Sequence, residues 1–167
     1  MSRRNWYLLT NSVVLAWITA GLVAVGVHRF VDQPLWLMVH VPLLGAATAA
    51  ILIWSQHFAD TLLRRPAPGG RVGLGIRLLG HTAGATLIVV GILVGLPLLA
   101  VVGAIGVAVV ALAHGVVLTI QLRHALPARF APLVRYYIAA STVFLGAIAA
   151  GTVLVLTDEP GVADRLV

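Results

Sequence analysis

The chain has 167 residues, of which 60% are hydrophobic and only 10% are charged. Soluble domains carry about 25% charged residues, so this composition excludes an ordinary soluble fold. The net charge of +6 comes from arginines scattered at the ends of apolar segments, which argues against a nucleic-acid-binding surface. No cysteine is present, which excludes disulfides, thiolate metal sites and cysteine-ligated iron–sulfur clusters.

Proline, glycine and arginine divide the sequence into five apolar segments, each long enough for a helix that crosses a bilayer. We predict helices at about 6–28, 35–59, 73–95, 97–121 and 132–156. The first is too long for the apolar region of a typical signal peptide, so we expect it to be retained. Short connections predict that consecutive helices run antiparallel. The predicted fold class is an all-α integral membrane protein, with one five-helix membrane domain over residues 1–167.

The arginines indicate the orientation in the membrane, because cytoplasmic segments retain positive charge. With the N-terminus inside, nine arginines fall on the inner side and two on the outer side. The inner set is Arg3, Arg4, Arg64, Arg65, Arg71, Arg77, Arg123, Arg129 and Arg135, and the outer set is Arg29 and Arg165. We therefore expect the C-terminus outside and the protein in the cytoplasmic membrane of a bacterial cell.

Small residues recur four positions apart, a spacing that lets helices in a membrane approach closely. The pairs are Gly45 and Ala49, Gly80 and Gly84, Gly91 and Gly95, and Gly146 and Ala150. They predict close packing in general without identifying one interface.

Histidines are the main candidates for chemistry, because ionisable side chains inside a membrane are costly and typically functional. At least four of the six lie well inside predicted helices, namely His40, His57, His81 and His114. Seventeen residues separate His40 from His57, about 25 Å along a helix, so these two cannot share a metal ion. His57, His81 and His114 lie on three helices, within roughly two turns of the inner boundary. His40 and the weaker candidate His28 mark an outer level.

Imidazoles at one depth can supply two axial ligands to haem b or three nitrogen ligands to copper. We predict cofactor ligands among His40, His57, His81 and His114, and copper ligands, in the alternative without haem, at His57, His81 and His114. A histidine between helices is equally often a hydrogen-bonding residue. That simpler interpretation is favoured for His28 and for His124, which lie at interfaces.

Ligating histidines usually give their second ring nitrogen to a hydrogen-bond partner. The candidate partners at the inner level are Ser55, Gln56, Thr82 and Thr119. A second set, Arg77, Arg135, Tyr136 and Tyr137, is placed to meet haem propionates. Anchoring at the membrane interface is the ordinary role of arginine and tyrosine at helix ends, and it is the alternative for each of these.

Several function classes lack support. The sequence has no glycine-rich nucleotide-binding pattern with lysine and no nucleophile elbow, which disfavours kinases and hydrolases. No carboxylate pair lies in a predicted span, which disfavours a carboxylate-driven transporter.

The second apolar segment carries His40, Gly45, Thr48, Ile51 and His57 in an order that resembles a haem-ligating helix of the haem–copper oxidase and nitric-oxide reductase superfamily. Together with 113–115, 126–130 and 135–137, it is similar to the membrane module that precedes cupredoxin domains in some bacterial multicopper oxidases of nitrite-reductase type. The resemblance covers residues 35–150 and implies redox or metal chemistry at His40, His57 and His114. An adjacent His-His pair is absent, so oxygen or nitric-oxide reduction is not implied.

The leading hypothesis is a membrane protein that binds haem, or haem with copper, and passes electrons to or from a partner. That partner would be an extracytoplasmic cupredoxin or a quinone, and the chain would be a component of an oxidoreductase. Two alternatives stay open: a haem-free copper-handling protein, and a cofactor-free assembly or packing subunit. The expected surroundings are the lipid bilayer and further copies of the chain in a homo-oligomer, with no nucleic acid.

Overall fold

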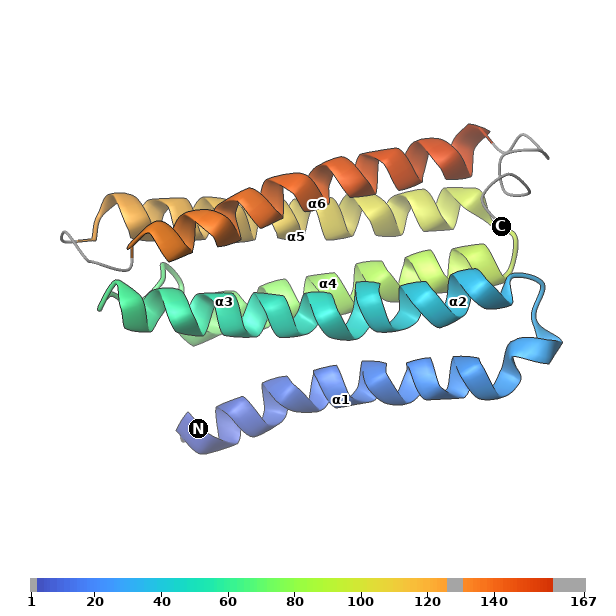
Figure 1. Cartoon of the computed structure of the whole chain (residues 1–167), viewed down its shortest axis with the longest axis horizontal. Helices are drawn as coiled ribbons and strands as arrows, with labels where there is room; N and C mark the ends of the chain where they lie inside the picture. The colour runs from blue at the N-terminus through green and yellow to red at the C-terminus, as the bar shows by residue number, and fades with distance from the viewer. Residues whose placement is uncertain (1–2, 126–130, 158–167) are drawn as a thin grey trace.

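The computed structural model describes residues 3–125 and 131–157, which are helical except at short connections and contain no strand. Five segments are long and apolar enough to cross a membrane: Arg4–Phe30, Pro34–Leu62, Gly70–Leu93, Pro97–Arg123 and Ala131–Thr157. They run along one axis and alternate in direction, so that α1 begins and α6 ends at opposite ends of the bundle (Figure 1). The all-helical fold and the five apolar segments are confirmed, and each predicted end lies within three residues of the observed one.

The first segment consists of α1 (Arg3–Val27) and a 3-10 turn, η1 (His28–Phe30). The second contains α2 (Pro34–His40), the π-helical η2 (Val41–Ala47) and α3 (Thr48–Leu62). The others are α4 (Gly70–Leu93), α5 (Pro97–Arg123) and α6 (Ala131–Thr157). Gly95 has φ +66° in the turn before Pro97, a conformation that glycine adopts at little cost. The turn makes α4 and α5 antiparallel neighbours.

The π-helical segment η2 is an irregularity in the middle of the second span. It contains Pro42, which has no backbone N–H to donate to the helix. The Thr48 hydroxyl donates to the Leu43 carbonyl five residues earlier, at 3.0 Å. Trp17 of α1 packs on Gly45 so closely that a Cβ added there would lie 2.2 Å from the indole ring. Glycine at this position therefore lets α1 dock on the widened turn.

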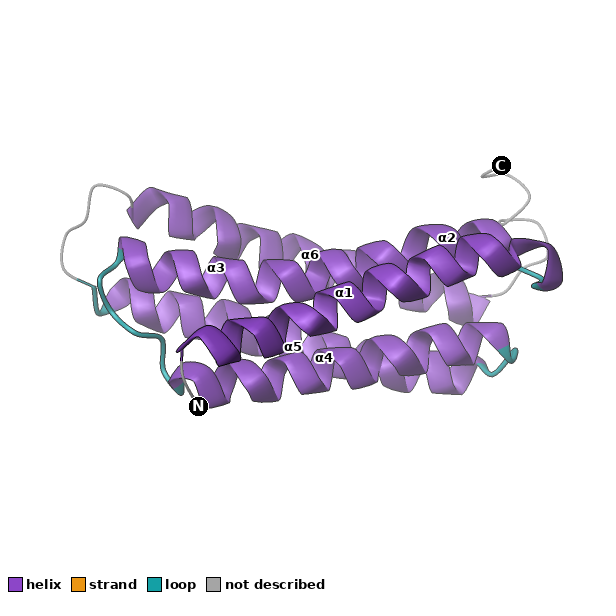
Figure 2. Cartoon of the chain, turned by 90° about the horizontal axis from the view of Figure 1, so that it is seen from below, coloured by secondary structure: helices purple, strands orange, loops and turns teal. Residues whose placement is uncertain are grey.

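The closest helix contact joins α4 and α5, which run together along one side of the bundle (Figure 2). A Cβ added to Gly103 would lie 2.5 Å from the Gly84 carbonyl oxygen. A Cβ on Gly91 would lie 2.5 Å from the Ala100 backbone nitrogen. Gly84 and Gly91 therefore lie at a close contact, as their spacing predicts, whereas Gly146 on α6 has no such neighbour within 4 Å.

Helix α6 is peripheral. Val134 is the one buried residue along its described length. Helix α6 packs on α5 and also contacts α3. Toward its C-terminal end it diverges from α2, as Figure 1 shows. This divergence leaves the space in which two cavities lie.

Candidate cofactor site

Two of the predicted ligands are among the most buried side chains of the protein. His81 on α4 is 0% exposed and His114 on α5 is 2% exposed. Both line one cavity of about 440 Å³, the inner cavity. Ligand pockets typically enclose roughly 300–1,000 Å³, so this volume is that of a ligand site. The structure thus brings these two imidazoles to the same space.

The inner cavity is otherwise almost entirely apolar. Four helices form its walls, and its lining residues besides the two histidines are Thr48, Ile51, Leu52, Val107, Val110, Ala111, Ala140, Ser141, Val143, Phe144 and Ala147. The Thr48 hydroxyl is engaged with the Leu43 carbonyl, and the Ser141 hydroxyl donates to the Tyr137 carbonyl at 3.1 Å. The two imidazoles are therefore the lining side chains that could ligate a metal through nitrogen.

Three of the four ring nitrogens in the inner cavity have no hydrogen-bond partner. Ser55 Oγ lies 2.8 Å from His114 Nε2, but His114 Nδ1 is unpaired. The backbone of Leu44 and Gly45, in the π-helical segment, approaches the His81 ring without reaching hydrogen-bond geometry, so both His81 nitrogens stay unpaired. Buried polar atoms are rarely left unpaired, because desolvating them costs about 1–3 kcal/mol. These nitrogens are free to meet a ligand.

His81 and His114 both lie well inside their helices. His81 is eleven residues from the start of α4 and His114 nine residues from the end of α5. At ~1.5 Å per residue these separations are about 16 Å and 14 Å. For His81 this separation is about one turn more than the predicted helix bounds give, because α4 begins three residues earlier than expected.

Arg77 lies one turn before His81 on α4 and is 7% exposed. Its guanidinium Nη2 donates to Gln56 Oε1, and the Gln56 amide donates to the Gly70 carbonyl at 3.4 Å. Arg77 Nε is buried and has no partner. Gln56 therefore partners Arg77 rather than a histidine, and Ser55 holds His114 instead. Arg77 therefore lies buried within α4, inside the predicted helix 73–95, rather than in a loop.

His57 lies outside the inner cavity. Its Nδ1 is 2.7 Å from the Tyr7 hydroxyl of α1, and its ring meets the rings of Tyr7, Trp54 and Phe58. It lines a separate, polar cavity of about 300 Å³ that also includes Asp60. Among the described residues no three histidine or carboxylate groups lie close enough to hold a metal ion. The expected copper set of His57, His81 and His114 is thus not assembled in this arrangement.

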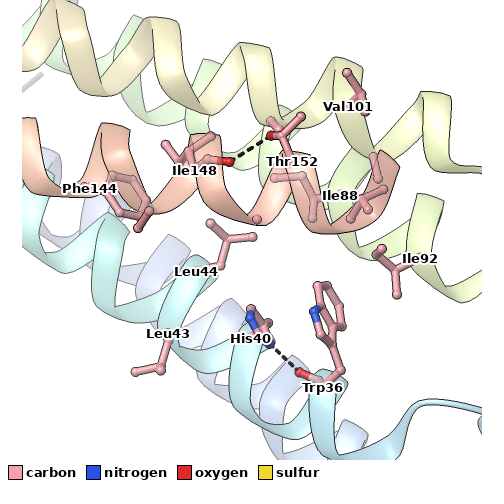
Figure 3. Close-up of a pocket in the computed structure, with 15 residues that line it drawn as sticks. Trp36, His40, Leu43, Leu44, Ile88, Ile92, Val101, Phe144, Ile148 and Thr152 are labelled. Carbon is pink, nitrogen blue, oxygen red and sulfur yellow. Dashed lines mark hydrogen bonds between the residues drawn. The ribbon is translucent and has the colours of Figure 1, made fainter. Parts of the chain in front are cut away.

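The outer histidines are also apart from the inner cavity. His40 donates from Nδ1 to the Trp36 carbonyl at 2.9 Å and stacks on the Trp36 ring, with centroids 4.4 Å apart (Figure 3). His28 is exposed, and its Nδ1 lies 2.7 Å from the Val25 carbonyl oxygen. His28 and His40 therefore each contact a residue of their own segment and do not contact each other in the described residues.

Three further predicted partners, Arg135, Tyr136 and Thr119, have other surroundings. Arg135 and Tyr136 are exposed at the start of α6, and Tyr136 is 72% exposed. The Thr119 hydroxyl donates to the Gly115 carbonyl at 2.8 Å. The exposure of Arg135 and Tyr136 fits the alternative in which they anchor the membrane interface. The hydrogen bond of Thr119 lies within α5 and does not involve a histidine.

Sequence reasoning missed two polar contacts at the inner end. One is the Tyr7 partner of His57. The other is fully buried Gln121, whose amide donates to Asp60 Oδ1 at 2.8 Å and to the Arg65 carbonyl. The same Asp60 oxygen accepts from the Ala67 backbone N–H at 2.9 Å. This cluster ties the loop between α3 and α4 to the end of α5, and the polar residues at the loop ends were its signal.

No protein-family model, curated protein or solved structure matches the chain. The resemblance to the membrane module of multicopper oxidases therefore stays a prediction from short motifs. Of the residues it implies, His114 lies in the inner cavity, whereas His40 and His57 do not line it.

Proposed function

We propose that the chain is a multi-pass membrane protein that binds b-type haem in the inner cavity through His81 and His114 and takes part in electron transfer. The observation that carries the proposal is one apolar cavity with two buried imidazoles from different helices. Each imidazole has at least one unpaired ring nitrogen. Either ring nitrogen of a neutral histidine can ligate a metal.

The residues fit haem in two respects. The walls are apolar, as the faces of a porphyrin require, and two imidazoles match a bis-histidine ligand set. The Ser55 hydroxyl orients the His114 ring through Nε2, so His114 would ligate haem through Nε2 once this contact is released. When bound, the haem would supply a one-electron carrier inside the membrane.

The alternatives fit these observations less well. The three-nitrogen copper set expected from the sequence is not assembled, because the described residues supply only two of its imidazoles to the inner cavity. A packing subunit without cofactor leaves the cost of three unpaired buried nitrogens without compensation. Haem is therefore the first hypothesis to test and copper the second.

The test is a reduced-minus-oxidised visible spectrum of the detergent-purified chain, with haem and metal content measured on the same sample. We expect a Soret band with sharp α and β bands on reduction. His81→Ala and His114→Ala should each remove most of this absorbance, because each deletes a proposed ligand. His57→Ala is the matched control: it removes a histidine on α3 outside the inner cavity and should leave the spectrum unchanged.

Other results would reject the assignment. Protein that stays colourless after haem reconstitution would reject the haem hypothesis. Bound copper in that sample would favour the copper hypothesis. Equal loss of absorbance in His57→Ala would show that the ligand set is not the one proposed.

We also propose that the five segments cross the cytoplasmic membrane of a bacterium with the N-terminus inside. Eight arginines besides Arg77 lie at the inner ends or loops, against two on the outer side. A reporter active only outside the cytoplasm, fused after Val167, should be active, and a cytoplasmic reporter at the same point silent. The reverse pattern would invert the orientation.

A further inference from the structure

A second cavity, the outer cavity, lies toward the other end of the bundle. It encloses about 270 Å³ between the second segment, α4, α5 and α6 (Figure 3). It shares Phe144 and Ala147 with the inner cavity, so the two are neighbours along α6. Of its fifteen lining residues, only Trp36, His40 and Thr152 have polar side-chain atoms.

The protons of His40 and Thr152 are already used. A carbonyl oxygen only accepts, so the contact between His40 Nδ1 and the Trp36 carbonyl places the ring proton of neutral His40 on Nδ1. Nε2 is then left with a lone pair. The Thr152 hydroxyl donates to the Ile148 carbonyl at 2.8 Å, so its oxygen also presents lone pairs. Figure 3 shows both contacts.

A ligand that pairs with both His40 and Thr152 must therefore bring hydrogen-bond donors on an apolar body. A hydroxyl group meets this need, and its oxygen can also accept from the Trp36 indole N–H. A carboxylate or an oxidised quinone carries acceptors only, which His40 and Thr152 cannot satisfy. A flat aromatic ring bearing hydroxyls suits a narrow space lined by Trp36, His40 and Phe144.

We propose that the outer cavity binds the hydroquinone head group of an isoprenoid quinol, with a phenolic O–H donating to His40 Nε2. The choice of a redox-active ring over another hydroxylated lipid rests on the proposed function. Helices α2 and α6 are barely in contact beside this cavity, whereas α5 and α6 pack along their length. His40 and Leu43, which line this cavity, are exposed on the surface of the bundle, so an isoprenoid tail has a path to the lipid beside them.

Binding is tested by isothermal titration of the full chain in lipid nanodiscs with decylubiquinol, kept reduced without oxygen, and separately with decylubiquinone. We expect the quinol to bind about tenfold more tightly than the quinone, the ratio that about one hydrogen bond supplies. His40→Leu should weaken quinol binding by about tenfold. Thr152→Val keeps the side-chain shape and should weaken it several-fold, which preserves the test if the His40 variant does not fold.

Two controls separate this proposal from the haem assignment. His28→Leu changes an outer histidine that does not line the cavity and should leave quinol affinity unchanged. His81→Ala, which lacks a proposed haem ligand, should still bind quinol, because binding is measured without any haem signal.

Three results would overturn the proposal. Equal affinity for quinol and quinone would show that the cavity does not select a hydrogen-bond donor. Unchanged affinity in both His40→Leu and Thr152→Val would show that the quinol does not bind in the outer cavity. Farnesol bound as tightly as the quinol would make the occupant a lipid alcohol.

Discussion

Helix α5 packs on α4 and on α6 in different ways. Toward α4, Gly103 approaches the Gly84 backbone so closely that even one added carbon would clash with it. Toward α6, a Cβ on Gly115 would meet only the Ser141 side chain, at 3.3 Å. Backbone contact fixes the relative position of α4 and α5, which carry His81 and His114. The looser packing of α6 leaves room for both cavities.

The contrast shows that a rigid support and an accessible site are built from the same residue types. Glycines occur on both sides of α5, and only their neighbours decide whether they bring backbones together. The paired imidazoles need the first kind of contact, because ligand geometry tolerates little movement. Entry of a ligand needs the second kind.

The largest expected effect comes from breaking the α4–α5 contact. Gly103→Ala would place its Cβ 2.5 Å from the Gly84 carbonyl oxygen and 2.7 Å from the Ile88 backbone nitrogen. Because backbone atoms cannot move aside as a side chain can, we expect a loss of at least about 2 kcal/mol in the free energy of unfolding. Denaturation in detergent, followed by circular dichroism, measures it.

The same substitution on the other side of α5 is the matched control. Gly115→Ala meets a single small side chain and gains about 0.5 kcal/mol from a less flexible unfolded chain, so its stability should stay the same or rise slightly. Equal destabilisation by the two variants would show that α6 packs as tightly as α4.

A smaller effect is expected from Phe144 of α6, which lines both cavities. Phe144→Ala in a tightly packed core would cost about 3–5 kcal/mol. Phe144 is only partly buried and already borders open space, so we expect a loss of about 1 kcal/mol. Thermal unfolding of the purified variant measures it, and a loss as large as that of a core phenylalanine would contradict the loose packing of α6.

The fold was largely predictable because long apolar segments between Pro, Gly and Arg locate helices by length alone. The π-helical segment was not predictable. It combines Pro42 with the docking of Trp17 on Gly45, a contact between helices that no local pattern encodes. Assignment as one continuous helix over 35–59 therefore missed the change in backbone geometry at Val41–Ala47.

For the candidate site, the position of each histidine along its helix could be approximated from the sequence, but the direction in which its side chain points could not. Counting residues placed His57, His81 and His114 in the inner half. The side of the helix on which each lies depends on rotation about the helix axis, which an amphipathic pattern reveals in soluble helices. Here the helices are apolar on all sides, so nothing indicated that His57 turns toward Tyr7 while His114 turns toward Ser55.

The π-helical segment Val41–Ala47 also sets the rotation of α3 about the helix axis relative to α2. One residue corresponds to about 100° of rotation in an α-helix with 3.6 residues per turn. Deleting one residue from this turn would rotate α3 relative to α2 by about that angle. Ser55 would then leave His114, while His40 would keep its place beside Trp36. The irregular turn therefore sets the angular alignment between the outer and inner cavities, a property that an insertion or deletion can change without altering any lining residue.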